Sequence, residues 1–134
     1  MQSPNSDLLQ ALYTQLDDNL SYNVYQAYVP DFVTPAVVIT QFENAEDNAF
    51  NCSGSNNTFL IECVKDFTTS ISKLDLYAIE NDVVQYLTEN KLILNNQNDI
   101  LLTWINSVDQ FETLANGAQR GKRLLRFRIL LQQK

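Results

Sequence analysis

The sequence contains no histidine, and this absence narrows the chemistry open to the chain. Histidine is the usual general base near neutral pH, a common zinc ligand and the partner of most nucleophilic triads. Glycine is also scarce, with three residues in 134, and their spacing matches neither a dinucleotide-binding loop nor a P-loop. We therefore expect no enzyme activity, no catalytic residue and no bound metal or cofactor.

Long apolar runs and an N-terminal secretion signal are missing too. The longest nearly uncharged apolar stretch, around Ile100 to Ile105, is far shorter than the roughly 20 residues of a membrane-spanning helix. No basic residue precedes an apolar run at the N-terminus, which argues against secretion. We expect a protein assembled in the cytoplasm without membrane contact, in which Cys52 and Cys63 form no disulfide.

Apolar residues are present along the whole length of the chain. They make up 45% of the sequence, which predicts a packed globule rather than a disordered segment. The length of 134 residues fits one core, and neither a linker nor an internal repeat divides it. We expect a single α+β domain over residues 1–134.

Charge is strongly segregated along the sequence. All sixteen acidic residues lie between Asp7 and Glu112, together with three cations, so residues 1–112 carry a charge of −13. The other six cations follow Glu112 and give residues 113–134 a charge of +6. A basic segment of this kind binds nucleic acid, docks on the acidic part of a neighbouring copy, or pairs with acids of its own molecule.

The acidic part of the chain argues against nucleic acid. A charge of −13 beside the basic segment repels phosphate, and Phe127 alone is interleaved with the arginines where bases would stack. Docking between copies and pairing within one molecule both stay open. If copies dock, the candidate contact residues are the cations Arg120, Lys122, Arg123, Arg126 and Arg128 and the acids Glu43, Glu46 and Asp47.

The N-terminal part predicts a helix followed by two strands. Ser3 and Pro4 resemble an N-cap and a first-turn residue, and leucines then recur at helical spacing up to about Asp18. The aromatic segment Tyr22 to Val29 predicts a short edge strand. The continuous apolar run Ala36 to Ile39 is typical of a central strand that is buried on both faces.

The middle of the chain predicts a loop, a strand and a second helix. Residues 41–57 are acidic and rich in Asn and Ser, which predicts a long loop or loose hairpin. Apolar residues alternate over residues 59–67, which predicts a strand beside the preceding one. After the capping hydroxyls of residues 68–70, apolar residues at helical spacing predict a helix over residues 71–89.

Three further strands are predicted in the C-terminal part, at residues 92–94, 100–108 and 124–132. Residues 110–122 predict a flexible connection, of a length that is usually functional or disordered. In the last strand, apolar residues alternate with Arg126 and Arg128, so we expect one face of the strand to pack in the core and the other to face solvent. The expected fold is one mixed or antiparallel sheet of about five or six strands with two helices packed against it.

Taken in order, these segments resemble the tail terminator, or tail-completion, family of long-tailed phages, which also supplies tail-to-head joining proteins. Asn-rich turns in place of glycine-rich ones, and the long segment 41–57, depart from the commonest family pattern. The resemblance is carried by the leucine-patterned opening helix (residues 8–13), the proline-led strand Thr34-Pro35-Ala36-Val37-Val38-Ile39, the strand 58–64, the helix 74–83 and the closing Lys122-Arg123-Leu124-Leu125-Arg126-Phe127-Arg128-Ile129.

This resemblance implies a late virion structural protein of the tail neck. Family members form a ring, usually hexameric, that stacks on the last ring of the tail tube protein, halts tube growth and meets the head connector, or stopper. DNA passes through the lumen without specific binding, and an acidic chain suits that passage because it does not hold the polyanion. Another neck or head-closure ring protein and a monomeric protein-binding adaptor remain alternatives. The resemblance identifies no catalytic residue.

Overall fold

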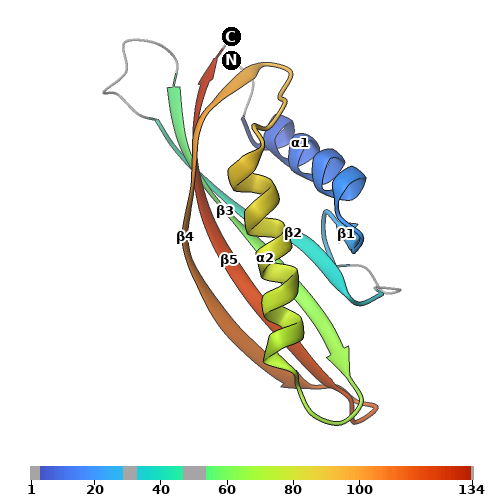
Figure 1. The fold of residues 1–134 in the computed structure, drawn as a ribbon. Helices are drawn as coiled ribbons and strands as arrows, with labels where there is room; N and C mark the ends of the chain where they lie inside the picture. Colours follow the sequence, from blue (N-terminus) through green and yellow to red (C-terminus); the bar gives the residue numbers. More distant parts are fainter. Residues whose placement is uncertain (1–3, 29–32, 47–53, 134) are drawn as a thin grey trace.

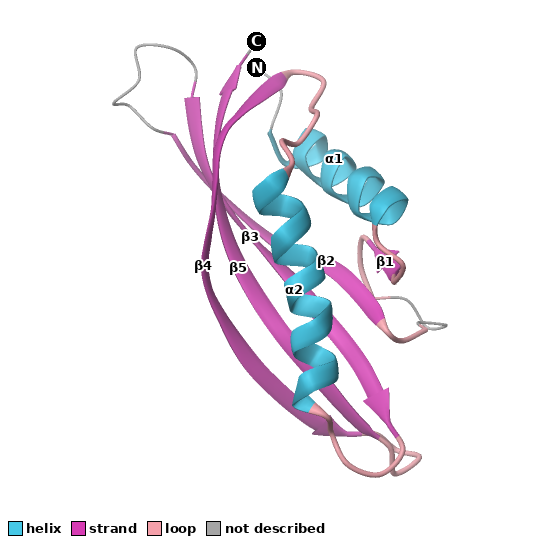
Figure 2. Ribbon diagram, in the orientation of Figure 1, coloured by secondary structure: helices cyan, strands magenta, loops and turns pink. Residues whose placement is uncertain are grey.

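Five strands and two helices make up the fold in the computed structural model, which describes residues 4–28, 33–46 and 54–133. The sheet has the strand order β1-β2-β3-β5-β4, and both helices lie on one of its faces (Figures 1 and 2). In chain order the elements are α1 (Pro4–Asn19), β1 (Asn23–Tyr25), β2 (Ala36–Glu46), β3 (Gly54–Phe67), α2 (Lys73–Glu89), β4 (Gln97–Thr113) and β5 (Gln119–Gln133).

The sheet is mixed, because β1 and β2 run parallel while the other neighbouring strands are antiparallel. The expected α+β class, with one sheet and two helices packed on it, is therefore confirmed. The predicted short edge strand corresponds to β1, and Val29 lies outside the described residues. The run Ala36 to Ile39 is also confirmed as buried sequence within an interior strand.

The core lies between the sheet and the helix layer. The leucines at helical spacing in α1 and the apolar stripe of α2 are buried against alternate residues of β2, β3 and β5. Phe59 and Phe127 stack at the centre, with ring centroids 5.3 Å apart. Ser72 caps α2, because its hydroxyl accepts a hydrogen bond from the backbone N–H of Asp75.

For residues 41–57, the hairpin alternative of the prediction holds, but the paired strands extend much further than expected. Strand β2 continues to Glu46 and β3 already begins at Gly54, so the two strands form a long hairpin. Asn and Ser favour turns when considered alone. Here β3 is paired with β2 on one side and with β5 on the other, and this pairing outweighs the local preference.

The predicted strand at residues 92–94 is also wrong. Leu92 and Leu94 are buried in the core while Ile93 is exposed, and the segment forms an isolated bridge instead of a ladder. Side chains satisfy its backbone: the N–H of Leu92 donates to Asp99 Oδ2, and the N–H of Ile93 donates to Gln15 Oε1. The apolar residues of this segment alternate between buried and exposed as they would in a strand, but the segment forms no ladder, so the strand prediction failed.

Residues 110–122 do not form the expected flexible connection. Strand β4 continues to Thr113 and β5 begins at Gln119, which leaves a short turn with Gly117 at a φ of 86°. Polar residues continue the ladder because opposite charges face each other across it, with Glu112 beside Arg120 and Lys122. The β4–β5 hairpin is thus ordered almost to its tip.

Candidate functional site

Strand β5 divides the candidate basic residues between the two faces of the sheet. Successive strand residues point to opposite sides. Arg123 shares the helix side with the buried residues of β5 and reaches Glu80 of α2. Arg120, Lys122, Arg126 and Arg128 belong to the opposite side. The five cations therefore do not form one patch.

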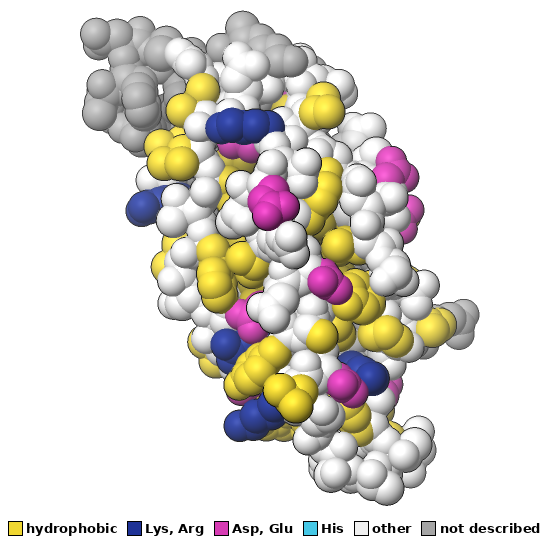
Figure 3. Space-filling view, viewed as in Figure 1, with side chains coloured by type: hydrophobic (Ala, Val, Ile, Leu, Met, Phe, Trp, Pro, Cys, Tyr) yellow, Lys and Arg dark blue, Asp and Glu magenta, His cyan; other side chains and the backbone are white. Residues whose placement is uncertain are grey.

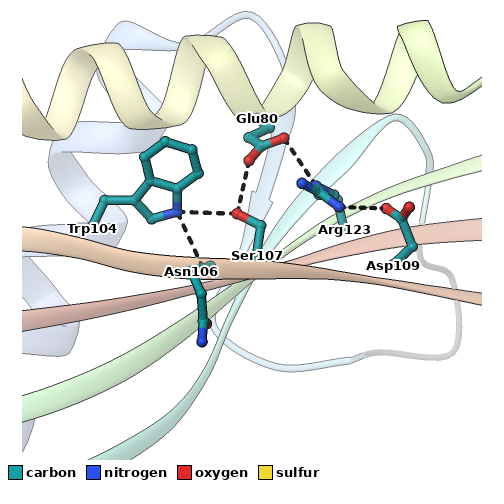
Figure 4. Close-up of polar contacts among 6 residues, drawn as sticks. All are labelled: Glu80, Trp104, Asn106, Ser107, Asp109 and Arg123. Atoms are coloured by element: carbon teal, nitrogen blue, oxygen red, sulfur yellow. Dashed lines mark hydrogen bonds and ion pairs between the residues drawn. The ribbon is translucent and has the colours of Figure 1, made fainter.

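Beneath α2, Arg123 takes part in a polar network (Figure 4). Its Nε donates to Glu80 Oε2 at 3.0 Å, and its Nη1 donates to Asp109 Oδ1 at 2.9 Å. Ser107 Oγ donates to Glu80 Oε1 at 2.7 Å and accepts from Trp104 Nε1 at 3.0 Å. The network joins α2 to β4 and β5, with Glu80 5% exposed at its centre and Trp104 42% exposed at its edge.

The surroundings of this network favour a structural role for Arg123. Burial by itself lowers the pKa of its guanidinium, but hydrogen bonds to Glu80 and Asp109 raise the pKa above its usual value. The guanidinium also lies over the Tyr77 ring, 5.0 Å from its centroid. The neighbouring Cys63 is a free, buried thiol whose pKa is raised by burial and then by Glu80, so it carries no reactive thiolate.

On the opposite side of the sheet, two of the cations are held within the molecule. Arg120 makes a bidentate contact with Asp66, with Nε–Oδ1 at 2.7 Å and Nη2–Oδ2 at 3.0 Å. Lys122 lies 3.5 Å from a carboxylate oxygen of Glu112. Its Nζ also lies over the Tyr28 ring. The alternative of internal pairing therefore holds for Arg120, Lys122 and Arg123.

Arg126 and Arg128 behave differently. Both are exposed, and neither side chain makes an ion pair or hydrogen bond with any residue in the part of the chain that the structure describes. Across the sheet, Arg126 lies between Leu60 and Asn106, while Arg128 lies between Thr58 and Thr103. No acid stands directly beside either arginine.

Apolar side chains surround these two arginines. Leu124 and Leu130 precede and follow them on the same side of β5, and both are partly exposed. Leu101 and Val108 of β4 are 54% and 58% exposed, and they lie opposite Leu130 and Leu124. We call this surface the open sheet face; it comprises Leu60, Leu101, Val108, Leu124, Arg126, Arg128 and Leu130.

The open sheet face ends at β4, a long edge strand whose ladder with β5 is interrupted by register shifts at Asp99/Leu101 and Trp104/Asn106. Strand β4 pairs with β5 on one side and with no other strand of the described residues. Its 17 residues contain no Lys, Arg or Pro, which are the residues that commonly block pairing at an edge. Six large apolar side chains of β4 are exposed: Ile100, Leu101, Trp104, Ile105, Val108 and Phe111.

Two of the three acidic candidates, Glu43 and Glu46, belong to the second half of β2. Glu43 pairs with Thr58, which in turn pairs with Arg128, so the backbone register places Glu43 two strands from Arg128. Glu46 pairs with Ser55 near the end of β2. Asp47 lies outside the described residues.

Sequence reasoning missed a second acidic surface, on the helix side. Asp17 and Asp18 end α1, Asp82 and Glu89 lie on α2, and all four are exposed. Figure 3 views this side and shows acidic side chains over both helices. A hollow of about 370 Å³ between the helix ends is lined by residues that include Asp82 and Glu89. The available signal was the absence of a basic residue from the last turn of either helix.

The described part of the chain offers neither an ion site nor a membrane-spanning helix. Among residues 4–28, 33–46 and 54–133, no group of three or more Cys, Asp or Glu is arranged to hold a metal ion. Neither of the two helices described combines the length and the apolar character needed to cross a membrane. The features that remain are surfaces: the open sheet face, the β4 edge and the acidic helix side.

Comparison with known proteins gives a likeness of fold. No family model and no curated protein sequence matches the chain. A solved chain of the virion of a native gene transfer agent particle matches with a TM-score of 0.75 at 18% sequence identity. The match covers 98% of this chain and 99% of that one, so the whole arrangement of helices and strands is shared.

Proposed function

We propose that the chain is a virion structural protein that forms a ring at the head-proximal end of a phage tail tube. There it terminates tail growth and joins the tail to the head connector, while DNA passes through without specific binding. The observation that carries this proposal is the match over 98% of the chain to a chain of a virion particle, since the likeness extends to the complete fold.

The surfaces of the molecule support the same role. A ring is built from a heterologous contact, in which two unlike patches of each subunit meet. This chain has two unlike patches, an arginine-bearing apolar sheet face and an acidic helix side. The absence of histidine from the sequence also favours a structural protein over an enzyme. We place the protein in the virion neck, in contact with copies of itself, the tube protein and the connector.

The direct test is to produce particles without this chain and to measure tails and heads by negative-stain electron microscopy. A terminator stops the growth of the tube, so its loss should give tails of irregular length that are not joined to heads. Restoring the chain in trans should restore both a uniform length and joining.

Other roles give different particles in the same experiment. Loss of a head-closure ring would leave tails of uniform length and heads that fail to retain DNA. Loss of an adaptor that is not part of the particle would leave complete virions. Either result would contradict the proposed role in tail termination.

A further inference from the structure

We propose that the open sheet face of one copy docks on the acidic helix side of the next copy, with Arg126 and Arg128 meeting the acids at the ends of α1 and α2. The occupant of the open sheet face is thus a second copy of this chain. This inference rests on the proposed ring, because it names the contact that would build it.

The composition of the open sheet face is that of an interface. It combines exposed Leu101 and Val108 with two exposed arginines, while Lys122 on the same side of β5 is held by Glu112 and the Tyr28 ring. Arginine and large apolar residues are enriched at interfaces, whereas Lys, Glu and Asp are depleted there. Ile100 and Ile105, at the two register shifts of β4, are exposed as well, whereas the exposed Trp104 and Phe111 belong to the helix side. A surface of this kind is normally covered in an assembly.

Among the described residues, no cation forms an ion pair with the acids of the helix side, which are Asp17, Asp18, Asp82 and Glu89. The C-terminal end of a helix carries partial negative charge, and acidic side chains there are unfavourable. Asp17 and Asp18 nevertheless end α1 and Glu89 ends α2, with no basic residue in either last turn. Lys91 follows α2, but its Nζ donates to the carbonyl of Ile100. Guanidinium groups from outside would offset this charge.

Charge complementarity selects a second copy as the occupant. Each copy carries both the arginines and the acids, on opposite sides of the molecule, so copies join head to tail. Such a heterologous contact closes into a ring when the rotation between successive copies permits it. Two open sheet faces meeting each other would instead bring the arginines of both copies together, which is unfavourable. A nucleic acid is a less suitable occupant, because its phosphate backbone would contact two unpaired arginines on a chain that carries a net charge of −7.

The test uses two charge reversals that leave the core untouched. The sheet variant carries Arg126→Glu and Arg128→Glu, and the helix variant carries Asp18→Arg and Glu89→Arg; all four positions are exposed. A matched control carries Lys65→Glu and Lys73→Glu, which changes the net charge as much as the sheet variant does, at the other end of α2. Circular dichroism and thermal unfolding establish that each variant folds.

Sedimentation velocity of the full chain, over a range of concentrations, measures association. Each reversal alone should raise the dissociation constant roughly a hundredfold or more, because like charges then face each other. An equimolar mixture of the two variants should recover association, since each reversed face meets a compatible partner. The control should associate like the parent chain.

The outcomes separate this contact from the proposed function. If the parent chain associates and both reversals leave it unchanged, or if the parent never associates, the contact is overturned, whatever the particle experiment shows. If the reversals and the mixture behave as expected while particles lacking the chain are normal, the contact stands and the tail role fails. Tight binding of short duplex DNA by the parent, lost in the sheet variant whose self-association is unchanged, would assign the face to nucleic acid instead.

Discussion

Glu80 is the buried hydrogen-bond acceptor at the centre of the polar network beneath α2. Its two carboxylate oxygens accept from Arg123 and Ser107 at a position that is 5% exposed. Glu80→Ala leaves both donors short of a partner beneath α2, so we expect the free energy of unfolding to fall by about 2 kcal/mol. Urea denaturation followed by circular dichroism measures this loss.

Two other substitutions control that experiment. Glu80→Gln keeps an acceptor oxygen, and Asp109 still pairs with Arg123, so its loss should be smaller. Glu89→Ala removes an exposed carboxylate from the same helix and should change stability by less than about 0.5 kcal/mol. Equal midpoints for Glu80→Ala and Glu89→Ala would show that the network contributes nothing.

Tyr22 gives the protein a sensitivity to alkaline pH. Burial, followed by the hydrogen bond that its hydroxyl donates to Asp82, raises the pKa of Tyr22 to about 12. Tyrosine in an unfolded chain has a pKa of about 10. Because the folded pKa is the higher one, the stabilisation is fully present below pH of about 10 and is lost as pH rises toward about 12.

This shift is measurable from tyrosinate absorbance. The difference between titrations of the parent and the Tyr22→Phe variant isolates the one hydroxyl among the six tyrosines. Its midpoint should lie near pH 12 in the folded protein. A midpoint at the value of an unfolded chain would mean that the contact with Asp82 does not form.

At the scale of elements, the β4–β5 turn depends on one glycine. Gly117 has a φ of 86°, and its N–H donates to the carbonyl of Leu114 at 3.0 Å. No atom lies within 4 Å of a Cβ added there, so the cost of Gly117→Ala is backbone strain alone. We expect a loss of about 1 kcal/mol in urea denaturation. Gly117→Asn should lose less, since Asn tolerates positive φ, and equal stability of all three chains would contradict the strain.

Element positions followed from sequence where the signal was local. Strand β5 was predictable because apolar residues alternate with Arg126 and Arg128, and α2 because of its apolar stripe. The cap of α2 is Ser72 and not one of the hydroxyls predicted at residues 68–70. The ends of β2, β3 and β4 were not predictable. Their polar residues are held by partners far away in the sequence, such as Asn57 opposite Ile129.

The candidate site shows the same division between local and distant information. Alternation in β5 places Arg126 on the wet side, so its exposure followed from sequence. The internal pairing of Arg123 did not, because Glu80 and Asp109 reach it from α2 and β4. The acidic helix side was missed for the same reason: Asp18 and Glu89 belong to helices that are brought together by the fold.

In the whole molecule, the charged residues that are segregated along the sequence become segregated between two surfaces of the fold. Of the five described cations that follow Glu112, three are neutralised locally: Arg120, Lys122 and Arg123. The unneutralised remainder, Arg126 and Arg128, stands on the opposite side of the sheet from the acids of the helix layer. The molecule is thus polarised across its thickness, although its net charge is −7.

This polarity predicts how association depends on salt. Raising NaCl from about 0.1 M to about 1 M shortens the screening length from about 10 Å to about 3 Å, so docking through Arg126 and Arg128 should weaken. The apolar part of the open sheet face should keep some association at high salt, and sodium sulfate at the same ionic strength should preserve more of it. An Arg126→Leu, Arg128→Leu variant retains the apolar surface without the charges, so its association should hardly change with NaCl. If the parent chain shows the same indifference to NaCl in sedimentation velocity, the two arginines are merely solvated and the contact is apolar alone.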